Sequence, residues 1–547
     1  MAHTGEGDFD RFPRRSVLAG LGGFGVAGAA GCISTNPGVE LESDAEELIF
    51  EGFQEAGVEP PVETTIYSNA ENEGRKRWAQ LVQRELDDTD LFDVSFETLE
   101  WTSYIDLVNN MAANEENALV CLGFIGGWDP HQYVYPGFHS DSFTPTGLNI
   151  NHYENERVDE LIDEGVATVD EDDRVSIYEE LQKLLVEESP LSFVRAPEEI
   201  VTYRADAVDG FRTYPVPGDE YKSIYAPTLG VYTELAADET ELVGDAGTKI
   251  DSYDPVRAAD DVSHMATGLL YEQLLEIDFD GSVRPLLATD WHRIDERTWR
   301  FELREGVRFH TGEPFTAADV EATLERYEGS PSERDVYTWY ESADVLGDHE
   351  IEITLRRPYG PLEIAVAQVP ILPKAVADGT HDISERPVGT GPYAFEKHEP
   401  ARLWRLVANE DHWHDGSNGV PETPPIETVT MRIITETSAR RGALETGDIH
   451  LTTGLPNESL DAFEDDDGFV VDRTTGAAVD FLGYPSYREP FSNPKVRRGI
   501  GRLIPRQRII EDVFNGAGTA AYTPISPTHE TFVDPEFEAR IVDEYFS

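Results

Sequence analysis

Apolar and polar side chains alternate along residues 298–303, where Trp299, Phe301 and Leu303 are separated by charged residues. A period of two is typical of a strand with one buried face. Glu305-Gly306 follows directly and predicts a turn that pairs this strand with the apolar residues of 307–309. The pattern therefore predicts a hairpin.

A helix is predicted shortly after this hairpin. Thr316 is followed three residues later by Asp319, an arrangement similar to a capping box. Apolar positions then recur at helical spacing, at Val320, Leu324 and Tyr327. Neither element carries a group with catalytic chemistry, so we interpret this segment as scaffold.

The first third of the chain alternates between strand-like and helix-like patterns. Strands are predicted over 64–67, 92–96 and 118–124, and helices over 44–56, 73–86, 101–111, 155–168 and 172–187. The first helix has a capping box at Ser43 and Glu46, and Gly57 ends it. This alternation predicts an α/β lobe with a largely parallel sheet, in which ligands bind beyond the carboxyl ends of strands.

Acidity dominates the composition. The chain has 43 Lys and Arg against 107 Asp and Glu, a formal net charge of −64 in 547 residues. Such a surface makes nucleic acid a poor partner. Because 39% of the residues are hydrophobic, the chain can still build cores. We therefore interpret the acidity as a haloarchaeal type of adaptation to molar salt, in which charges are screened within about 3 Å.

The N-terminus predicts export and anchoring. Arg14 and Arg15 precede an uncharged Gly/Ala-rich run over 18–31 that is too short to span a membrane as a helix. A twin arginine before such a run is similar to a Tat signal, and the residues around Cys32 resemble a lipobox, which makes Cys32 the lipidated residue. Cys121 lies in an apolar run, so we expect a buried core thiol and no disulfide.

The sequence lacks the common catalytic motifs. It contains no G-x-S-x-G, no H-E-x-x-H and no G-x-x-x-x-G-K-[ST], so it offers no standard hydrolase, metallopeptidase or NTPase device. His412-Trp413-His414 gives at most two metal ligands, so we interpret it as a surface turn. We expect no cofactor and no metal.

Several segments together resemble one family. These are ATDW at 288–291, RTWRFELREGVRFHTGEPFTAADV at 297–320, PVGTGPY at 387–393, ALETGDI at 443–449, FLGY at 481–484, PFSNPKVR at 490–497 and GFIGGWDPHQY at 123–133. They are similar to the family 5 extracytoplasmic solute-binding proteins, the oligopeptide- and dipeptide-binding components of ABC importers. The resemblance covers nearly the whole mature chain. It implies a two-lobe periplasmic-binding-protein-like α/β fold with an extra subdomain in the first lobe.

The order of these segments is inverted relative to the family, which indicates a circular permutation; the alternative is a fusion of two unrelated halves. Residues 228–240 would then be an exposed loop joining the ancestral termini. The expected division is a signal over 1–32, the second lobe over 33–196 and 484–547, the first lobe over 197–260 and 389–483, and its accessory subdomain over 261–388. The segment 389–392 would cross between the lobes and form a hinge-side wall of the cleft.

The resemblance implies a ligand cleft between the lobes, with contacts at Phe124, Gly127, Trp128, Asp129, Tyr253, Thr390 and Tyr484. One departure affects the ligand. Peptide-binding members often have an aspartate before the aromatic residue of the cleft loop, and here Gly127 precedes Trp128. A buried ammonium without a partner is costly, so a dipeptide, a nickel complex, a sugar oligomer and other solutes remain open.

The resemblance implies a binding protein rather than an enzyme. We expect a monomeric receptor, lipid-anchored at the outer face of the cytoplasmic membrane after Tat export, that delivers a peptide or other small solute to an ABC permease and ATPase. A sensory or chaperone-like binding protein on the same fold is the alternative. A secreted hydrolase would require an activated nucleophile, which the sequence does not show.

The net charge makes a direct prediction about salt. When molar KCl is dialysed away, far-UV circular dichroism should report loss of structure, because self-repulsion is no longer screened, and structure should return with the salt. Equal thermal midpoints at low and molar salt would contradict salt adaptation.

Overall fold

A computed structural model describes residues 41, 43–236, 239–258, 260–384 and 386–546. The expected signal residues Arg14, Arg15 and Cys32 lie outside the described residues. Cys121 is a free and fully buried thiol, as predicted. Within the described part of the chain, no helix combines the length and apolarity needed to cross a bilayer.

The second lobe consists of residues 41–196 and 477–546 and is built on one six-stranded sheet in the order β2-β1-β3-β22-β4-β23. Its strands are β1 (Val62–Asn69), β2 (Phe92–Leu99), β3 (Ala118–Ile125), β4 (Leu191–Ala196), β22 (Ala478–Gly483) and β23 (Thr519–Ala520). Its helices are α1 (Asp44–Ala56), α2 (Glu73–Asp87), α3 (Trp101–Asn110), α4 (His131–Phe138), α5 (Glu156–Ala167), α6 (Glu171–Glu188), α14 (Pro494–Leu503), α15 (Arg506–Arg508) and α16 (Pro535–Tyr545), with short helical turns at Ser140–Ser142 and Ile509–Val513.

The predicted strands and helices of this lobe are confirmed, including the capping box of α1 and the left-handed Gly57 that ends it. The sheet is less parallel than predicted. β1 is parallel to β2 and β3, but β22 lies antiparallel between β3 and β4. Residues 478–483, expected in the first lobe, therefore belong to the second, because their backbone completes its sheet.

The first lobe consists of residues 198–475 and contains several smaller sheets. They are β20-β5-β21, with β5 (Glu198–Arg204), β20 (Leu451–Thr452) and β21 (Phe469–Thr475); β10-β19-β18-β17, with β10 (Glu241–Ala246), β17 (Tyr393–Glu399), β18 (Leu403–Ala408) and β19 (Thr428–Ile433); β13-β14-β16-β15, with β13 (Ala288–Arg293), β14 (Thr298–Leu303), β15 (Tyr340–Gly347) and β16 (Glu350–Leu355); and the pairs β11 (Leu275–Ile277) with β12 (Val283–Pro285), β6 (Val208–Asp209) with β9 (Glu234–Leu235), and β7 (Tyr225–Ala226) with β8 (Val231–Tyr232).

The helices of the first lobe are mostly short. They are α7 (Asp261–Thr267), α8 (Ala317–Arg326), α9 (Glu333–Tyr337), α10 (Leu362–Val366), α11 (Lys374–Ala377), α12 (Thr437–Thr446) and α13 (Asn457–Glu464), with 3-10 turns at Lys222–Ile224, Pro227–Leu229 and Ser417–Gly419. The capping box of α8 at Thr316 and Asp319 is confirmed.

The predicted hairpin after β14 is wrong. β14 alternates as expected, with Trp299, Phe301 and Leu303 buried, but it pairs with β13 and β16. Residues 307–309 form only an isolated bridge, between Arg308 and Pro314. The exposed loop predicted over 228–240 is also wrong in its first half, because β8 and β9 lie there and Thr233 is fully buried between them.

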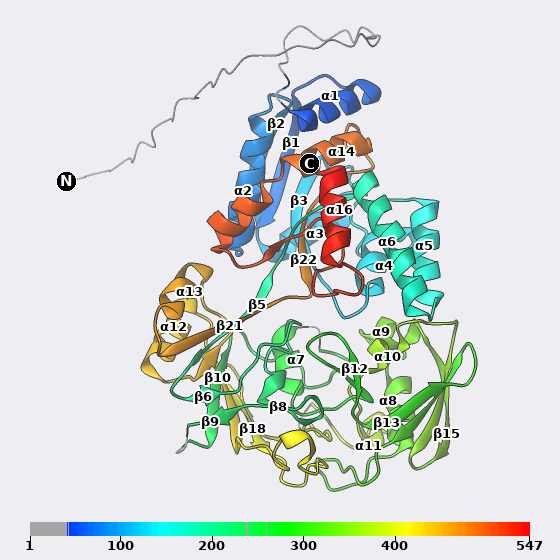
Figure 1. Ribbon diagram of the computed structural model, residues 1–547, viewed down its shortest axis with the longest axis vertical. Coiled ribbons are helices and arrows are strands. Elements are labelled where there is room, and N and C mark those ends of the chain that lie inside the picture. Colours follow the sequence, from blue (N-terminus) through cyan, green and yellow to red (C-terminus); the bar gives the residue numbers. More distant parts are fainter. Residues whose placement is uncertain (1–40, 42, 237–238, 259, 385, 547) are drawn as a thin grey trace, which may run out of the picture. The chain divides into compact units, whose positions relative to one another are not determined.

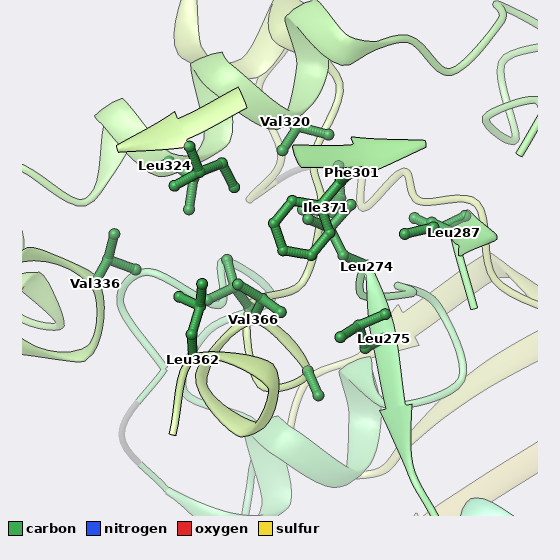
Figure 2. Close-up of a cluster of buried hydrophobic side chains, with 14 of the residues drawn as sticks. Leu274, Leu275, Leu287, Phe301, Val320, Leu324, Val336, Leu362, Val366 and Ile371 are labelled. Atoms are coloured by element: carbon green, nitrogen blue, oxygen red, sulfur yellow. The ribbon is translucent and has the colours of Figure 1, made fainter. Parts of the chain in front are cut away.

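Each lobe has its own hydrophobic core. One cluster, which includes Tyr104, Phe138, Leu185 and Phe481, is drawn entirely from the second lobe. Another fills the space between β14, α8 and α10 in the first lobe, where Leu274, Phe301, Val320, Leu362 and Ile371 point toward one another (Figure 2). Separate cores are what allow two parts of a chain to move as bodies.

The chain passes between the lobes twice, at Pro197 and at Gly476, and the two passages are neighbours. β5 and β21 are antiparallel partners on one side of this point, as β4 and β22 are on the other (Figure 1). The Gly476 amide donates to the Pro197 carbonyl at 2.8 Å. A Cβ at position 476 would lie 2.9 Å from that carbonyl oxygen, so the close approach requires glycine.

The segment 389–392, expected to cross between the lobes, instead lies inside the first lobe. The Gly391 amide donates to the Leu270 carbonyl at 3.0 Å, and a Cβ on Gly389 would lie 2.0 Å from the same oxygen. Gly389 and Gly391 therefore allow this segment to pack closely against the loop that contains Leu270 in the same lobe.

Candidate ligand cleft

The loop after β3 enters the first lobe. It begins where β3 ends, at the carboxyl edge of the parallel strands, which is where α/β sheets bind ligands. Trp128 in this loop is 7% exposed and belongs to the hydrophobic core of the first lobe, together with Val166. These are the two described second-lobe residues in that core. The indole packs on Tyr214, with ring centroids 5.7 Å apart, and a Cβ on Gly281 would lie 3.2 Å from it.

Asp129 fixes this loop instead of facing a ligand. One carboxylate oxygen accepts from the Arg174 guanidinium at 2.7 Å, and the other accepts from the His131 amide at 2.9 Å. Asp129 and Arg174 are both buried, at 3% and 7% exposed. A buried, hydrogen-bonded pair of this kind is costly to break, since one charge would then be left alone.

Gly127 has a neighbour that explains the absence of an aspartate there. A Cβ on Gly127 would lie 2.0 Å from the Gln132 side-chain oxygen. That oxygen accepts from the Asp129 amide at 3.1 Å, and the Gln132 amide group donates to Gln368 of the first lobe, also at 3.1 Å. Gln132 thus occupies the space that a larger residue at position 127 would need.

Tyr133 and His529 support the loop from behind. The Tyr133 hydroxyl donates to the Ala477 carbonyl at 2.7 Å and lies 3.0 Å from His529 Nε2. Burial lowers the pKa of His529 to about 4, so the ring is neutral at physiological pH. Its ring lies edge-on to Trp128 at 6.0 Å. The cleft loop and the crossing segment at Ala477 are therefore held by the same side chains.

The other predicted contacts are not gathered around Trp128. Phe124 packs against Phe138 and Phe481 in the core of the second lobe. The fully buried Tyr484 lies at the end of β22, where its hydroxyl is 2.6 Å from Ser192. Both contribute to packing.

Tyr253 and Thr390 have unsatisfied polar atoms in the first lobe. The Tyr253 ring packs edge-on to Phe395, and its buried hydroxyl has no hydrogen-bond partner. Thr390 is fully buried, and its Oγ1 is also without a partner. None of these contacts of Tyr253 and Thr390 involves Trp128 or a neighbour of Trp128 named here.

The surface turn predicted at 412–414 is wrong. The His412 side chain is fully buried and its Nε2 lies 3.0 Å from Glu272, which also accepts from the Trp413 indole at 2.9 Å. Beside it, a cavity of about 280 Å³ is lined by Arg304, whose guanidinium stacks on Trp413 at 4.0 Å. Within the described ranges, no group of three or more His, Cys, Asp or Glu could hold a metal.

A second cavity, of about 190 Å³, lies against the crossing strand β5. It is lined by Glu198, Glu199, Ile200, Thr202, Glu220, Thr452, Thr453, Leu455, Asn457 and Leu460. Burial raises the pKa of Glu199 to about 8 and that of Glu220 to about 7. Sequence analysis missed both residues, because no local pattern distinguishes two carboxylates in a chain that has 107.

The described residues form a two-lobe α/β protein with paired crossing segments, and parts of the chain are similar to known proteins. Residues 282–541 match the family described as bacterial extracellular solute-binding proteins, family 5 Middle. The glutathione-binding protein GsiB of Salmonella typhi is 27% identical over 310 residues, which cover 55% of this chain and 59% of GsiB. The nickel-binding periplasmic protein of Escherichia coli (strain K12) is 29% identical over 279 residues, 48% of this chain and 51% of that protein. Part of the chain is thus similar to the family 5 solute-binding proteins.

Solved structures overlap with part of the chain. DppA of Helicobacter pylori in complex with the peptide STSA is 25% identical, with a TM-score of 0.46, over 56% of this chain and 65% of DppA. NikZ from Campylobacter jejuni in complex with Ni(L-His) is 24% identical, with a TM-score of 0.38, over 42% of this chain and 46% of NikZ. The chain thus spans less than two thirds of the length of each of these relatives.

The position of Trp128 predicts how the lobes unfold. Trp128→Ala should lower the free energy of unfolding by about 3 kcal/mol, the usual cost of removing a buried tryptophan. Because it removes a side chain that links the two cores, scanning calorimetry in molar salt should also resolve two transitions where the parent shows one. Trp101→Ala is the matched control, since Trp101 is 46% exposed on the same lobe. A single transition in the Trp128 variant would show that other contacts couple the lobes.

Proposed function

We propose that this chain is the solute-binding component of an ABC importer and that it acts outside the cytoplasm. The observation that carries the proposal is the pair of lobes with separate cores, joined at the neighbouring residues Pro197 and Gly476. Two adjacent crossings form a hinge, so a solute that contacts both lobes favours their closure. The family match over 282–541 supports the same role.

The solute remains to be identified. The names of the similar proteins refer to glutathione, nickel and peptides, so these classes form the first panel to test. A sensory or chaperone-like binding protein on the same fold would differ in its partner and not in its cleft, and neighbouring permease and ATPase genes would favour import. We infer no enzymatic activity, since the interlobe side chains hold one another and none is arranged as an activated nucleophile with its base.

Solute capture is the test of this function. Protein purified from its own cells in molar salt should carry a small molecule detectable by native mass spectrometry, or bind members of a panel of glutathione, di- and tripeptides and nickel–histidine by calorimetry. Binding should reduce the radius of gyration in X-ray scattering, because the lobes close. No bound solute and no response to the panel would contradict the proposal.

A fractionation experiment tests the proposed membrane anchor. We propose that Cys32 is lipidated after export through the twin-arginine signal, so that Cys32→Ser moves the protein from the membrane fraction to the soluble fraction. A Cys121→Ser variant is the control, because Cys121 is a buried core thiol. Unchanged fractionation of the Cys32 variant would exclude the anchor.

We also propose that the chain is circularly permuted relative to its family. Two observations support this. The family match ends at 541 within the second lobe, whose remaining strands and helices come from residues 44–196. The first and last described helices also meet on one turn of α14. A Cβ on Gly499 would lie 2.8 Å from the Ala45 carbonyl, and Arg502 donates to the Tyr545 carbonyl at 2.6 Å.

A rearranged chain tests the permutation. If the last residues are joined to Asp44 by a short linker and the chain is reopened between Glu239 and Thr240, the protein should fold and melt within a few degrees of the parent, because both residues are exposed and new termini at exposed positions are tolerated. A chain joined in the same way but reopened inside β5 should not fold, since that break removes a crossing strand. Failure of the first chain to fold would rule out the permutation.

A further inference from the structure

The cavity beside β5 is a lined recess and not a gap between surface loops. It lies where the crossing strand meets β20 and α13, and its residues come from three separate stretches of the first lobe. It is also next to the hinge, because a Cβ on Gly476 would lie 2.8 Å from a carboxylate oxygen of Glu199. A group bound in this recess would therefore contact the point about which the lobes turn.

The polar groups that line the recess include several hydrogen-bond acceptors and no cation. They are the side chains of Glu198, Glu199, Thr202, Glu220, Thr452, Thr453 and Asn457. None of the lining residues is Lys, Arg or His. Glu198 is paired with the Arg473 guanidinium at 3.5 Å, whereas Glu199, Glu220 and the hydroxyls suit a group that donates several hydrogen bonds and carries positive charge.

Glu220 is the second, independent indication of a ligand. The residue is 7% exposed, and its Oε2 atom is buried without a hydrogen-bond partner. Backbone hydrogen bonds at Gly218 and Glu220 favour the ionised carboxylate, but burial outweighs them and raises the pKa of Glu220 to about 7. The pKa of Glu199 is raised to about 8 by burial first and by the negative charge of Glu220 second.

The nearest charged groups do not neutralise this pair. Asp219 and Asp261 add further negative charge near it. Arg195, which faces Glu199, is bound to Asp480 at 2.9 Å. Behind Thr452, Arg440 is paired with Asp245 at 3.1 Å. Lys222 lies 3.4 Å from Glu276. These three cations are each bound to another carboxylate, and Arg473 is shared between Glu464 and the lining residue Glu198.

We propose that the recess lined by Glu199 and Glu220 binds the ammonium group of an amine-bearing solute. This inference rests on the proposed function and specifies the substrate class. An ammonium group donates three hydrogen bonds and its charge compensates the two carboxylates, which lose their protons when it binds. A recess of about 190 Å³ is below the usual range of roughly 300 to 1,000 Å³ for a complete ligand site, so it would hold only the amine end of a larger solute.

The test uses n-butylamine as the probe and n-butanol as its uncharged analogue of the same shape. Saturation-transfer NMR in molar KCl should show saturable binding of the amine to the full chain and none of the alcohol. Glu199→Gln with Glu220→Gln should weaken amine binding by about tenfold or more, because charged hydrogen bonds become neutral ones. Glu458→Gln is the matched control, since Glu458 is exposed on α13, next to the cavity residue Asn457, and makes the same change of charge.

The pH profile distinguishes an ionic role from a merely structural one. Both carboxyls hold protons at pH 6 in the free protein, so amine affinity should rise by about tenfold between pH 6 and pH 9 as they ionise. The double variant should show no such rise. Its thermal midpoint in molar salt serves as the check that it has folded.

Three results would overturn the proposal: equal amine binding by the double variant, equal binding of n-butanol, or complete displacement of the amine by millimolar Mg²⁺ or Ca²⁺, which would indicate an inorganic cation site. The outcome is separable from that of the receptor function. If amine binding depends on Glu199 and Glu220 but the chain captures no solute, the amine site in the recess is supported and the proposed receptor function is refuted. If the chain captures a solute and neither substitution affects that capture, the receptor function is supported and the amine site in the recess is refuted.

Discussion

The hydrogen bond between Gly476 and Pro197 marks the constraint on which this molecule depends. Two strands leave one sheet side by side and enter another, and the glycine permits their backbones to approach closely. Because both crossings lie at one point, each lobe builds most of its core from its own residues and can turn about that point, while Trp128 and Val166 of the second lobe pack into the core of the first. The six-stranded sheet follows from the same arrangement, since β22 returns to it from the crossing and separates β3 from β4.

The loop after β3 is one of several places where the two lobes touch. Trp128 provides apolar area in the core of the first lobe, and Asp129 holds the loop by its pair with Arg174. Around them lie smaller polar contacts, such as the 2.7 Å bond from the Gly360 amide to the Val166 carbonyl and the 3.1 Å pair of Arg357 with Asp163. The exposed pairs contribute little by themselves, so the aromatic anchor dominates the energetics of this interface.

In this acidic chain, carboxyl groups at the surface and in the interior differ in how readily they ionise. Nearly all of the excess carboxylates can remain solvated, where salt screens their repulsion. Glu199 and Glu220 are exceptions, because burial raises the pKa of each carboxyl and the charge of Glu220 raises that of Glu199 further. A recess that raises the pKa of two carboxyls is unfavourable for the empty protein, and a bound cation offsets that cost.

The sequence by itself determined the local elements and the resemblance to the family 5 solute-binding proteins. Capping boxes at Ser43 and Thr316, the alternation of β14 and the strands and helices of 62–188 are encoded by neighbouring residues, so their periodicity predicts them. Only the tertiary structure decided which strands pair, and the local pattern misplaced the partner of β14 and the membership of β22 for that reason. It also decided the environment of single side chains. His412 is buried by the distant Glu272, Asp129 is held by Arg174, and the recess joins Glu199 to Glu220 and Thr452. These contacts link residues far apart in the chain, and burial and pairing depend on what the fold places beside a residue, which no local pattern records.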